Sequence, residues 1–483
     1  MPDRRGLTTP NDRPIGGVNG PFTEFSWLMS NTMNNSSARQ MRTTRRNFLT
    51  VAGAATAAGA LTPWYFSTAR TMADETKSPT ERPRVGCIGN GGQGRGDANA
   101  IKRYGDIIAN CDVDRTRAER FKQEIAEGKS EIYEDYRKLL ERHDVEIVTI
   151  STPDHWHTRI CIDALRAGKD VYCQKPLTLT IDEGKKLCHV VKETGRVVQV
   201  GTQQRSENNN QFLTAVAMVR EGRLGKISRV TCAIGGSPKG GPFPKTAAPA
   251  ELNWDLWLGQ APKVDYIKQR SHNDFRWWYE YSGGKLTDWG AHHVDIGQWA
   301  IGMEASGPTA IEVVSAVHPV ELRDGYPTVD DHFNAATEFN VRCLFANGVE
   351  LFIRDRADDL GFDNGVMFEG EAGRIFVNRG KLTGALVEAL KEKPIAEEIL
   401  INLRKGKRLD SHMGNFIECV RDRSTPVSDV DSHHRILTTC HLANIAMRLG
   451  RNLKWDPKTE QIVGDDAANA WQSREQRKGF EIA

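Results

Sequence analysis

Three glycines near residue 90 follow the spacing G-x-G-x-x-G, and the residues around them indicate what that spacing does. Gly89, Gly91 and Gly94 directly follow the apolar run 84–88, which predicts a short buried strand. The first glycine permits a tight turn, the second lets a diphosphate approach the backbone, and the third lets a helix pack closely on the strand. Asp112 follows about twenty residues later at the end of a second predicted strand, where its carboxylate can bind ribose hydroxyls. This pattern predicts a dinucleotide-binding turn.

Two further polar clusters directly follow predicted strands. Residues 151–157, with the sequence STPDHWH, follow one strand, and Gln174, Lys175 and Pro176 follow the next. Ligands of open parallel sheets bind at the carboxyl ends of the strands, so both clusters are candidates for the same site. Pro176 stiffens the turn that carries Lys175.

A third cluster has helical spacing. Asp288, His292 and Asp295 stand at i, i+4 and i+7, so on a helix they share one face. An imidazole titrates near neutral pH, which makes His292 the candidate base for a hydroxyl proton. Asp288 would orient it or bind substrate hydroxyls, and Lys175 would stabilise developing negative charge on oxygen. A helix N-cap and a hydrogen-bonded core histidine are the structural alternatives for Asp288 and His292.

Together these segments resemble the glucose–fructose oxidoreductase and inositol dehydrogenase family (Gfo/Idh/MocA) over about residues 84–449. The resemblance implies a Rossmann domain, a second α/β domain, and use of NAD or NADP on sugars or polyols. The family's Glu-Lys-Pro motif falls on Gln174, Lys175 and Pro176, and its Asp-x-x-x-His motif falls on Asp288 and His292. Gln174 departs from the family glutamate: it can bind a ribose hydroxyl but adds no charge beside Lys175.

The predicted site therefore has a catalytic and a cofactor-binding part, with no metal ligands assigned. The catalytic residues are Lys175, Asp288 and His292; the cofactor-binding residues are Gly89, Asn90, Gly91, Gly94, Asp112, Thr152, Pro153, His157, Gln174 and Lys175. Asp112 favours NAD because a carboxylate repels a 2′-phosphate, while the nearby Arg115 keeps NADP possible. The residues that either reach the cavity or pack in the core are His155, Trp156, Trp277, Trp278, Trp289, His293 and His332.

The elements predicted to position these residues form two α/β domains. Strands over 84–88, 106–111, 146–151, 170–173 and 197–201 alternate with helices, which predicts a doubly wound parallel sheet. Long alternating runs between about 310 and 378 predict a large, mostly antiparallel open sheet, and 384–405 is predicted to be irregular. We predict a signal and linker over 1–82, the nucleotide domain over 83–205, the substrate and oligomerisation domain over 206–455, and a tail over 456–483.

The composition and the N-terminal residues indicate which binding partners, which cysteine state and which cellular compartment to expect. A net charge of +2 gives no electrostatic reason for nucleic-acid binding. The nine cysteines form no C-x-x-C pair and mostly stand in apolar runs, so buried free thiols are expected. Arg45 and Arg46, followed by Phe48, Leu49 and a mildly apolar stretch, predict a twin-arginine signal over about 41–69 and a periplasmic enzyme. The resemblance also implies a homo-oligomer, either a dimer or a tetramer.

Four functions remain open from the sequence. The first is a sugar or polyol oxidoreductase whose nucleotide stays tightly bound, because free nucleotide is scarce outside the cytoplasm. The second is a glycosidase or lyase that uses bound NAD transiently through a 3-keto sugar, with no net redox change. The third is a non-catalytic nucleotide-binding protein. The fourth is a metal-dependent lyase or epimerase whose ligands would be His155, His157, His292, His293 and Asp295.

Overall fold

Strands and helices alternate regularly over residues 84–200 in a computed structural model, which describes residues 82–408 and 411–482. Six strands form a wholly parallel sheet in the order β3-β2-β1-β4-β5-β6. This is the strand order of a dinucleotide-binding Rossmann domain, as predicted. Its elements are β1 (Arg84–Ile88), α1 (Gly92–Ile101), β2 (Asp106–Cys111), α2 (Arg115–Glu124), β3 (Glu131–Tyr133), α3 (Tyr136–Leu140), β4 (Ile147–Ile150), α4 (Asp154–Arg166), β5 (Asp170–Cys173), α5 (Ile181–Thr194) and β6 (Val198–Val200).

Two details of this domain differ from the prediction. Strand β3 was not predicted, because it contributes only three residues, all partly or fully exposed. Helix α4, which the sequence predicts over 157–167, begins three residues earlier, at Asp154, with Pro153 as its N-cap. Proline is favoured at helix N-termini, where its missing N–H costs no hydrogen bond. The last four residues of the STPDHWH segment therefore form the first turn of α4, and the first three connect it to β4.

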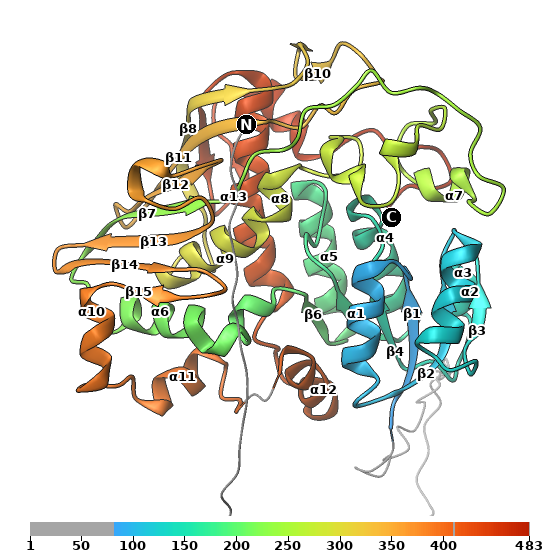
Figure 1. The fold of residues 1–483 in the computed structure, drawn as a ribbon, viewed down its shortest axis with the longest axis horizontal. Coiled ribbons are helices and arrows are strands. Elements are labelled where there is room, and N and C mark those ends of the chain that lie inside the picture. Colours follow the sequence, from blue (N-terminus) through green and yellow to red (C-terminus); the bar gives the residue numbers. More distant parts are fainter. Residues whose placement is uncertain (1–81, 409–410, 483) are drawn as a thin grey trace, which may run out of the picture. The chain divides into compact units, whose positions relative to one another are not determined.

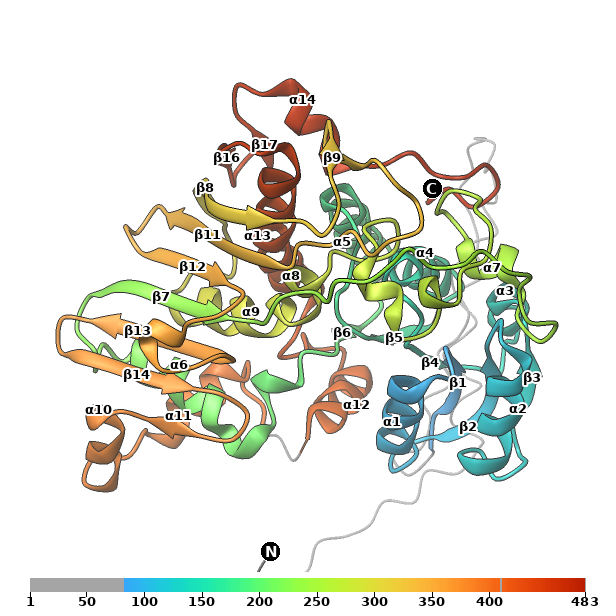
Figure 2. The ribbon, with the colours of Figure 1, turned by 45° about the horizontal axis from the view of Figure 1, so that its top comes forward.

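A nine-stranded sheet forms the second half of the molecule (Figures 1 and 2). Its order is β15-β14-β13-β7-β12-β11-β8-β16-β17, and all neighbours are antiparallel except β7 and β12. The strands are β7 (Ile227–Ala233), β8 (Pro308–Val317), β11 (Glu338–Phe345), β12 (Glu350–Arg354), β13 (Gly365–Gly370), β14 (Gly373–Val377), β15 (Leu382–Thr383), β16 (Leu453–Asp456) and β17 (Gln461–Ile462). A short hairpin of β9 (Leu322–Arg323) and β10 (Tyr326–Pro327) stands apart from it.

Helices pack against one side of this sheet and join it to the Rossmann domain (Figure 1). Helix α13 contacts both α5 and α9, so it links the two sheets. The remaining helices are α6 (Gln211–Arg220), α7 (Trp254–Leu258), α8 (Lys285–Asp288), α9 (Gly290–Ala300), α10 (Ala385–Glu388), α11 (Glu397–Leu403), α12 (His412–Asp422), α13 (Val430–Leu449) and α14 (Asp466–Asn469). Helices α10 and α11 lie in the segment predicted to be irregular. They bury no residue completely, so their apolar periodicity is weak.

Residues 250–282, which we call the aromatic flap, form a mostly irregular segment of the second domain that contacts the Rossmann domain near residues 113–115. Both views place its helix α7 beside α4 (Figures 1 and 2). The flap has a small core of its own, which includes Trp257, Phe275, Trp278 and Tyr281. The core explains why a long segment without regular strands is ordered: the buried aromatic area compensates for the loss of chain entropy.

All nine cysteines are buried and unpaired, as expected from the sequence. Among the described residues, no helix has both the length and the apolar character needed to cross a membrane. The proposed twin-arginine signal lies outside the described residues.

Candidate active site at the strand ends

A cavity of about 410 Å³ lies where the strands of the Rossmann sheet end, and we call it the strand-end cavity. One wall is formed by the turns after β1, β2, β4 and β5, and the opposite wall by the aromatic flap. The lining residues that matter below are Gly89, Gly91, Gln93, Asp112, Arg117, Thr152, Pro153, Asp154, His157, Gln174 and Lys175 from the Rossmann domain, and Leu252, Leu256, Trp257, His272, Phe275 and Arg276 from the flap.

The glycine turn has the geometry that a diphosphate requires. Gly89 has a φ of +87°, a conformation that favours glycine. A side chain on Gly94 would place its Cβ 1.8 Å from the Gly89 carbonyl oxygen, so only glycine allows this approach of helix and turn. Helix α1 has no side-chain cap at Gly91. Its first N–H groups therefore remain available to an anion in the cavity. Asn90 does not line the cavity: its Oδ1 accepts a hydrogen bond from Asn110 Nδ2 (2.8 Å), which anchors the turn.

Asp112 lines the strand-end cavity at the end of β2. Its two oxygens accept hydrogen bonds from the backbone N–H groups of Asn90 (2.8 Å) and Asp114 (2.9 Å). Burial raises the pKa of Asp112 to about 6, although these hydrogen bonds oppose the shift. The arginine beside it is Arg117, which lines the cavity. Arg115, the residue weighed from the sequence, is exposed and pairs with Glu119, because the two project outward at i and i+4 of α2.

The turns after β4 and β5 are tied together by a buried histidine. His157 Nδ1 lies 2.6 Å from the Pro176 carbonyl oxygen, and Nε2 lies 2.9 Å from that of Thr152. Burial lowers the pKa of His157 to about 4. Its geometry makes it a brace between the two turns, although it also lines the cavity. Thr152 Oγ1 is buried there without a hydrogen-bond partner among the described residues, so a ligand hydroxyl would satisfy it.

Lys175 of the Rossmann domain forms an ion pair with Asp288 of the second domain. Its Nζ lies 2.6 Å from Asp288 Oδ1, and both side chains are largely buried. Arg276 of the flap is the second cation at this carboxylate, 3.5 Å away. Burial alone would raise the pKa of Asp288, but Lys175 and Arg276 outweigh it and hold that pKa below its ordinary value. Asp288 is therefore an anion that positions cations rather than a proton donor.

A second cavity, of about 430 Å³, lies on the other side of Lys175, and we call it the His292 cavity. Gln93, Gln174 and Lys175 line both cavities, so the two spaces meet at these three residues. Burial lowers the pKa of His292 well below its ordinary value, and Lys175 and Arg379 lower it further. The other residues lining this cavity include Asp97, Tyr172, Glu207, Asn208, Trp289, Arg379 and His412.

The other candidate residues lie elsewhere, with two exceptions. Trp289 lines the His292 cavity, and Trp156 lines the strand-end cavity while donating to the Trp257 carbonyl oxygen. Asp295 shares the helical stretch of Asp288 and His292 but lies about one turn further along α9, where it is fully buried and pairs with Arg205 in the core. The residues that line neither cavity are His155, Trp277, Trp278, His293 and His332.

These positions bear on the metal hypothesis. Within the described part of the chain, no three His, Cys, Asp or Glu side chains form a group that could hold a metal ion. Two of the suggested ligands already have protein partners: His155 Nε2 contacts the Trp257 carbonyl oxygen, and His293 Nε2 contacts Asn364 Oδ1. The donor set needed by a metal-dependent lyase or epimerase is therefore not assembled in this part of the molecule.

Several site residues were not predicted. Asp154 and Asp97 each stood close to a recognised motif, one inside STPDHWH and the other three residues after Gly94. Either could have been found by placing α4 and α1 correctly. Arg276 lies in a four-residue 3₁₀ helix, and Glu207 and Arg379 lie outside the helices and strands. Neither setting has a periodicity that indicates which side chain faces a cavity.

Comparison with known proteins places this site in a family. Residues 83–202 match the model of the oxidoreductase family's NAD-binding Rossmann fold, and residues 241–482 match that of its C-terminal alpha/beta domain. A scyllo-inositol 2-dehydrogenase (NAD(+)) of Bacillus subtilis is 28% identical over 319 residues, which cover 65% of this chain and 79% of that protein. An alpha-N-acetylgalactosaminidase of Shewanella oneidensis is 29% identical over 206 residues, 38% of this chain and 44% of that protein.

A solved structure agrees at the level of the fold. The WlbA dehydrogenase of Bordetella pertussis, determined in complex with NADH and UDP-GlcNAcA, superposes with a TM-score of 0.54 at 17% identity. The superposition covers 78% of this chain and 99% of that one. With both domain models matched in order over the Rossmann domain and the large sheet, the chain belongs to the Gfo/Idh/MocA oxidoreductase family and carries its NAD-binding domain.

Proposed function

We propose that this protein is an NAD(P)-dependent oxidoreductase that moves a hydride to or from a carbon of a sugar, polyol or glycoside, with its nucleotide tightly bound. The observation that carries the proposal is the position of Lys175. It follows β5 at the edge where the nucleotide would lie, it holds Asp288, and it lines the cavity of His292. The Lys175 ammonium therefore lies where the strand-end cavity and the His292 cavity meet.

The residues present fit the nucleotide. Gly89, Gly91 and the start of α1 would hold the diphosphate, and Asp112 the adenosine ribose. Thr152 and Gln174 would face the nicotinamide half. When bound, the nicotinamide supplies hydride acceptance and donation, which no side chain can provide.

The chain's own residues would handle the proton. Neutral His292 accepts the substrate hydroxyl proton, because its low pKa keeps the imidazole unprotonated at neutral pH. Lys175 donates a hydrogen bond to the same oxygen and stabilises its negative charge. Asp288 keeps the Lys175 ammonium in place through the 2.6 Å contact, and its own low pKa means that it does not compete for the proton.

The His292 cavity has the character expected for a polyhydroxylated ring. Glu207, Asn208 and Arg379 provide hydrogen-bond acceptors and donors, and Trp289 provides an aromatic face suited to C–H groups. The Arg379 guanidinium lies over the Trp289 ring, 4.7 Å from its centre, which fixes both groups. This set supports a small sugar or polyol rather than an extended polymer.

Tight retention of the nucleotide is supported by the way the flap is fastened. The Asn253 N–H donates to the Val113 carbonyl oxygen (2.9 Å), and the Trp257 carbonyl oxygen accepts from Trp156 Nε1 (3.0 Å). The flap is held from outside by residues 473–482, which we call the C-terminal strap. Arg477 of the strap donates to the Gly259 carbonyl oxygen (2.8 Å) and to Asp255 Oδ1 (2.6 Å).

Weakening the strap should release the nucleotide faster. Arg477→Ala removes the side-chain contacts to the flap at Asp255 and Gly259, and we expect nucleotide dissociation to accelerate about tenfold or more. Loss of bound NADH fluorescence after addition of excess NAD⁺ would measure that rate. Arg451→Ala is the matched control, because it breaks an arginine–aspartate pair with Asp465 outside the strap. Equal dissociation rates in both variants and the wild type would contradict the role of the strap.

One alternative activity has specific support. The likeness to the alpha-N-acetylgalactosaminidase of Shewanella oneidensis, although partial, favours a glycosidase that oxidises and re-reduces its substrate on the enzyme. The same Lys175, Asp288 and His292 would serve both activities. The two activities differ only in whether the reaction leaves a net redox change.

The deciding experiment begins with native mass spectrometry of dialysed protein to detect a retained nucleotide. Absorbance at the reduced-nicotinamide band is then followed across a panel of sugars, polyols and aryl glycosides. A stoichiometric absorbance change with a sugar or polyol supports the oxidoreductase, and release of the aryl group without net absorbance change supports the glycosidase. Absence of nucleotide binding would overturn both proposals.

Export through the twin-arginine route and homo-oligomer formation stay predictions. The support for export is the Arg45-Arg46 pair with the following Phe48 and Leu49. Fractionation of cells that produce the chain with Arg45 and Arg46 changed to lysine would test it, because the changed chain should remain in the cytoplasm. The oligomeric state can be measured by light scattering of the purified protein.

A further inference from the structure

Asp97 is a buried carboxyl group at the His292 cavity that the proposed chemistry does not use. It lies on α1, one turn after the glycine motif, with 4% of its surface exposed. Its oxygens accept hydrogen bonds from Ser151 Oγ (2.7 Å), Gln93 Nε2 (3.0 Å) and Gln174 Nε2 (2.8 and 2.9 Å). All three donors are neutral, and no ion pair within the described ranges includes Asp97. Burial raises the pKa of Asp97 to about 6, because removing an ionised carboxylate from water costs free energy.

The contact with Gln174 decides which way its amide faces. A carboxylate only accepts hydrogen bonds, so the amide must turn its NH₂ group toward Asp97. The carbonyl oxygen Oε1 is then left without a hydrogen-bond partner in the region that the structure describes, while Gln174 lines both cavities. Gly201 makes room for this arrangement, because a Cβ there would lie 2.7 Å from Gln174 Oε1.

We propose that Asp97 is a positioning residue that orients the Gln174 amide so that its carbonyl oxygen accepts a hydrogen bond from a hydroxyl group of the bound nucleotide. This inference rests on the proposed function. Asp97 does not touch the ligand itself. It causes Gln174 to present a hydrogen-bond acceptor, rather than a donor, where the two cavities meet.

The substitution Asp97→Asn tests whether the Asp97 carboxylate determines which end of the Gln174 amide faces the cavities. The remaining amide oxygen, in the place of Oδ1, still accepts from Gln93, and the introduced NH₂ group, in the place of Oδ2, donates to the Ser151 hydroxyl, which can accept as well as donate. The same NH₂ group also faces Gln174, which supplies an acceptor by rotating its amide by half a turn. The free protein therefore keeps its hydrogen bonds, and its unfolding temperature should stay within about 3 °C of the wild type or rise. The cavity now meets an NH₂ group, and NADH affinity should fall about tenfold.

The reciprocal substitution should restore binding. In the double variant Asp97→Asn/Gln174→Glu, the NH₂ group of the introduced asparagine donates to one glutamate oxygen, and the other oxygen faces the cavity as an acceptor. We expect NADH affinity within about threefold of the wild type. Gln174→Glu alone places two carboxyl groups in contact, so it should weaken both binding and stability. A merely structural role for Asp97 predicts no such rescue.

The experiment is a calorimetric titration of the full chain, stripped of nucleotide with charcoal, with NADH as the probe. Asp170→Asn is the matched control: Asp170 is also buried but lies at the start of β5, where it accepts from the Val197 N–H and from Arg423. It should lower the unfolding temperature and leave NADH affinity unchanged. Wild-type affinity in Asp97→Asn, or a double variant as weak as the single one, would overturn the inference. If the wild type itself binds no NADH, the proposed function fails instead.

Discussion

Replacing His292 by alanine should lower kcat about a hundredfold or more while leaving nucleotide affinity within about threefold of the wild type. A positioned general base contributes roughly 10² to 10⁴ in rate. His292 lines the cavity beyond Lys175 but not the strand-end cavity, which explains why binding and turnover should separate. Steady-state turnover on the substrate found by the panel, together with an NADH titration of the same preparation, measures both quantities.

The adjacent His293 is the matched control. It is equally buried, but its Nε2 contacts Asn364 Oδ1 (3.0 Å) and it lines neither cavity. His293→Gln should retain most of the turnover. If His292→Ala turns over at more than about a tenth of the wild-type rate, another group takes the hydroxyl proton and His292 is not the base.

The pH profile gives the same assignment a second test. The base must be neutral to accept a proton, and burial keeps the pKa of His292 well below 6.5. In the oxidation direction, kcat should therefore stay level as the pH falls from 8 through 6.5 and decline only below that. A decline centred at 6.5 would indicate an exposed imidazole at the site instead.

The nucleotide half of the site follows from local rules, which is why it is predictable from sequence. The roles of Gly89, Gly94 and Asp112 depend on residues in the same βαβ unit, whose strands are short and mostly apolar. The substrate half depends on contacts between distant segments. Arg276 reaches its position from a short 3₁₀ helix and Arg379 from a segment outside the helices and strands, and only the tertiary structure determines where these side chains lie. Even within this unit, the sequence does not show that Arg117 is the arginine beside Asp112. Choosing it over Arg115 requires knowing which side of α2 faces the cavity.

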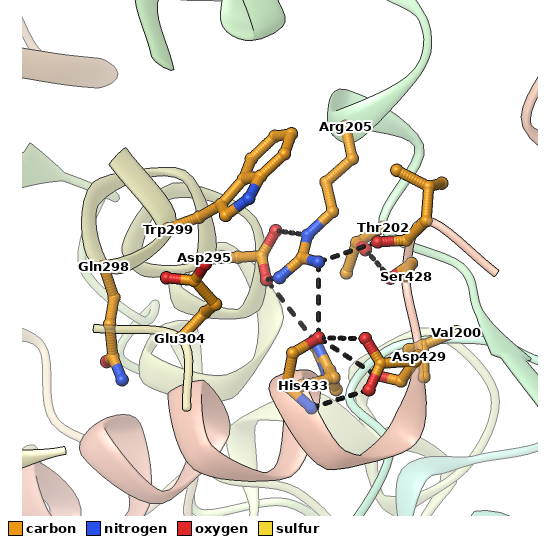
Figure 3. A network of polar contacts seen from close by, with 12 residues as sticks. Val200, Thr202, Arg205, Asp295, Gln298, Trp299, Glu304, Ser428, Asp429 and His433 are labelled. Carbon is orange, nitrogen blue, oxygen red and sulfur yellow. Dashed lines mark hydrogen bonds and ion pairs between the residues drawn. The ribbon is translucent and has the colours of Figure 1, made fainter. Parts of the chain in front are cut away.

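Asp295 is the position where helical spacing alone was misleading. Its spacing from His292 suggested the active site, but the side chain turns to Arg205, which follows β6 and comes from the other domain. Two hydrogen bonds of 2.6 and 2.8 Å join them, with 2% of the Arg205 side chain and 0% of the Asp295 side chain exposed (Figure 3). Periodicity predicts which residues share a helix face; it does not predict which of them face a cavity and which meet a buried partner.

Breaking this pair should produce the largest loss of stability of any single change considered. Asp295→Ala leaves the Arg205 guanidinium buried without its counter-ion, which costs about 3–5 kcal/mol. The remaining Arg205 contacts, to the Val427 carbonyl oxygen (2.9 Å), to Ser432 Oγ (3.3 Å) and to the face of Trp299, do not supply a negative charge. Urea unfolding of the full chain at pH 7.5 would measure the difference. Burial would raise the pKa of Asp295, but Arg205 holds it below its ordinary value, so the carboxylate is ionised there and its contribution fades only in acid.

Two further variants separate charge from packing. Arg205→Met/Asp295→Leu removes both charges and fills a similar volume, so it should recover most of the stability lost in Asp295→Ala. Asp359→Asn breaks an exposed pair with Arg354 and should cost under about 1 kcal/mol. If Asp295→Ala costs no more than Asp359→Asn, the pair is not a structural link. Because His292 lies one turn before Asp295 on α9, the double variant should also show whether a stable but uncharged junction still holds the base in place.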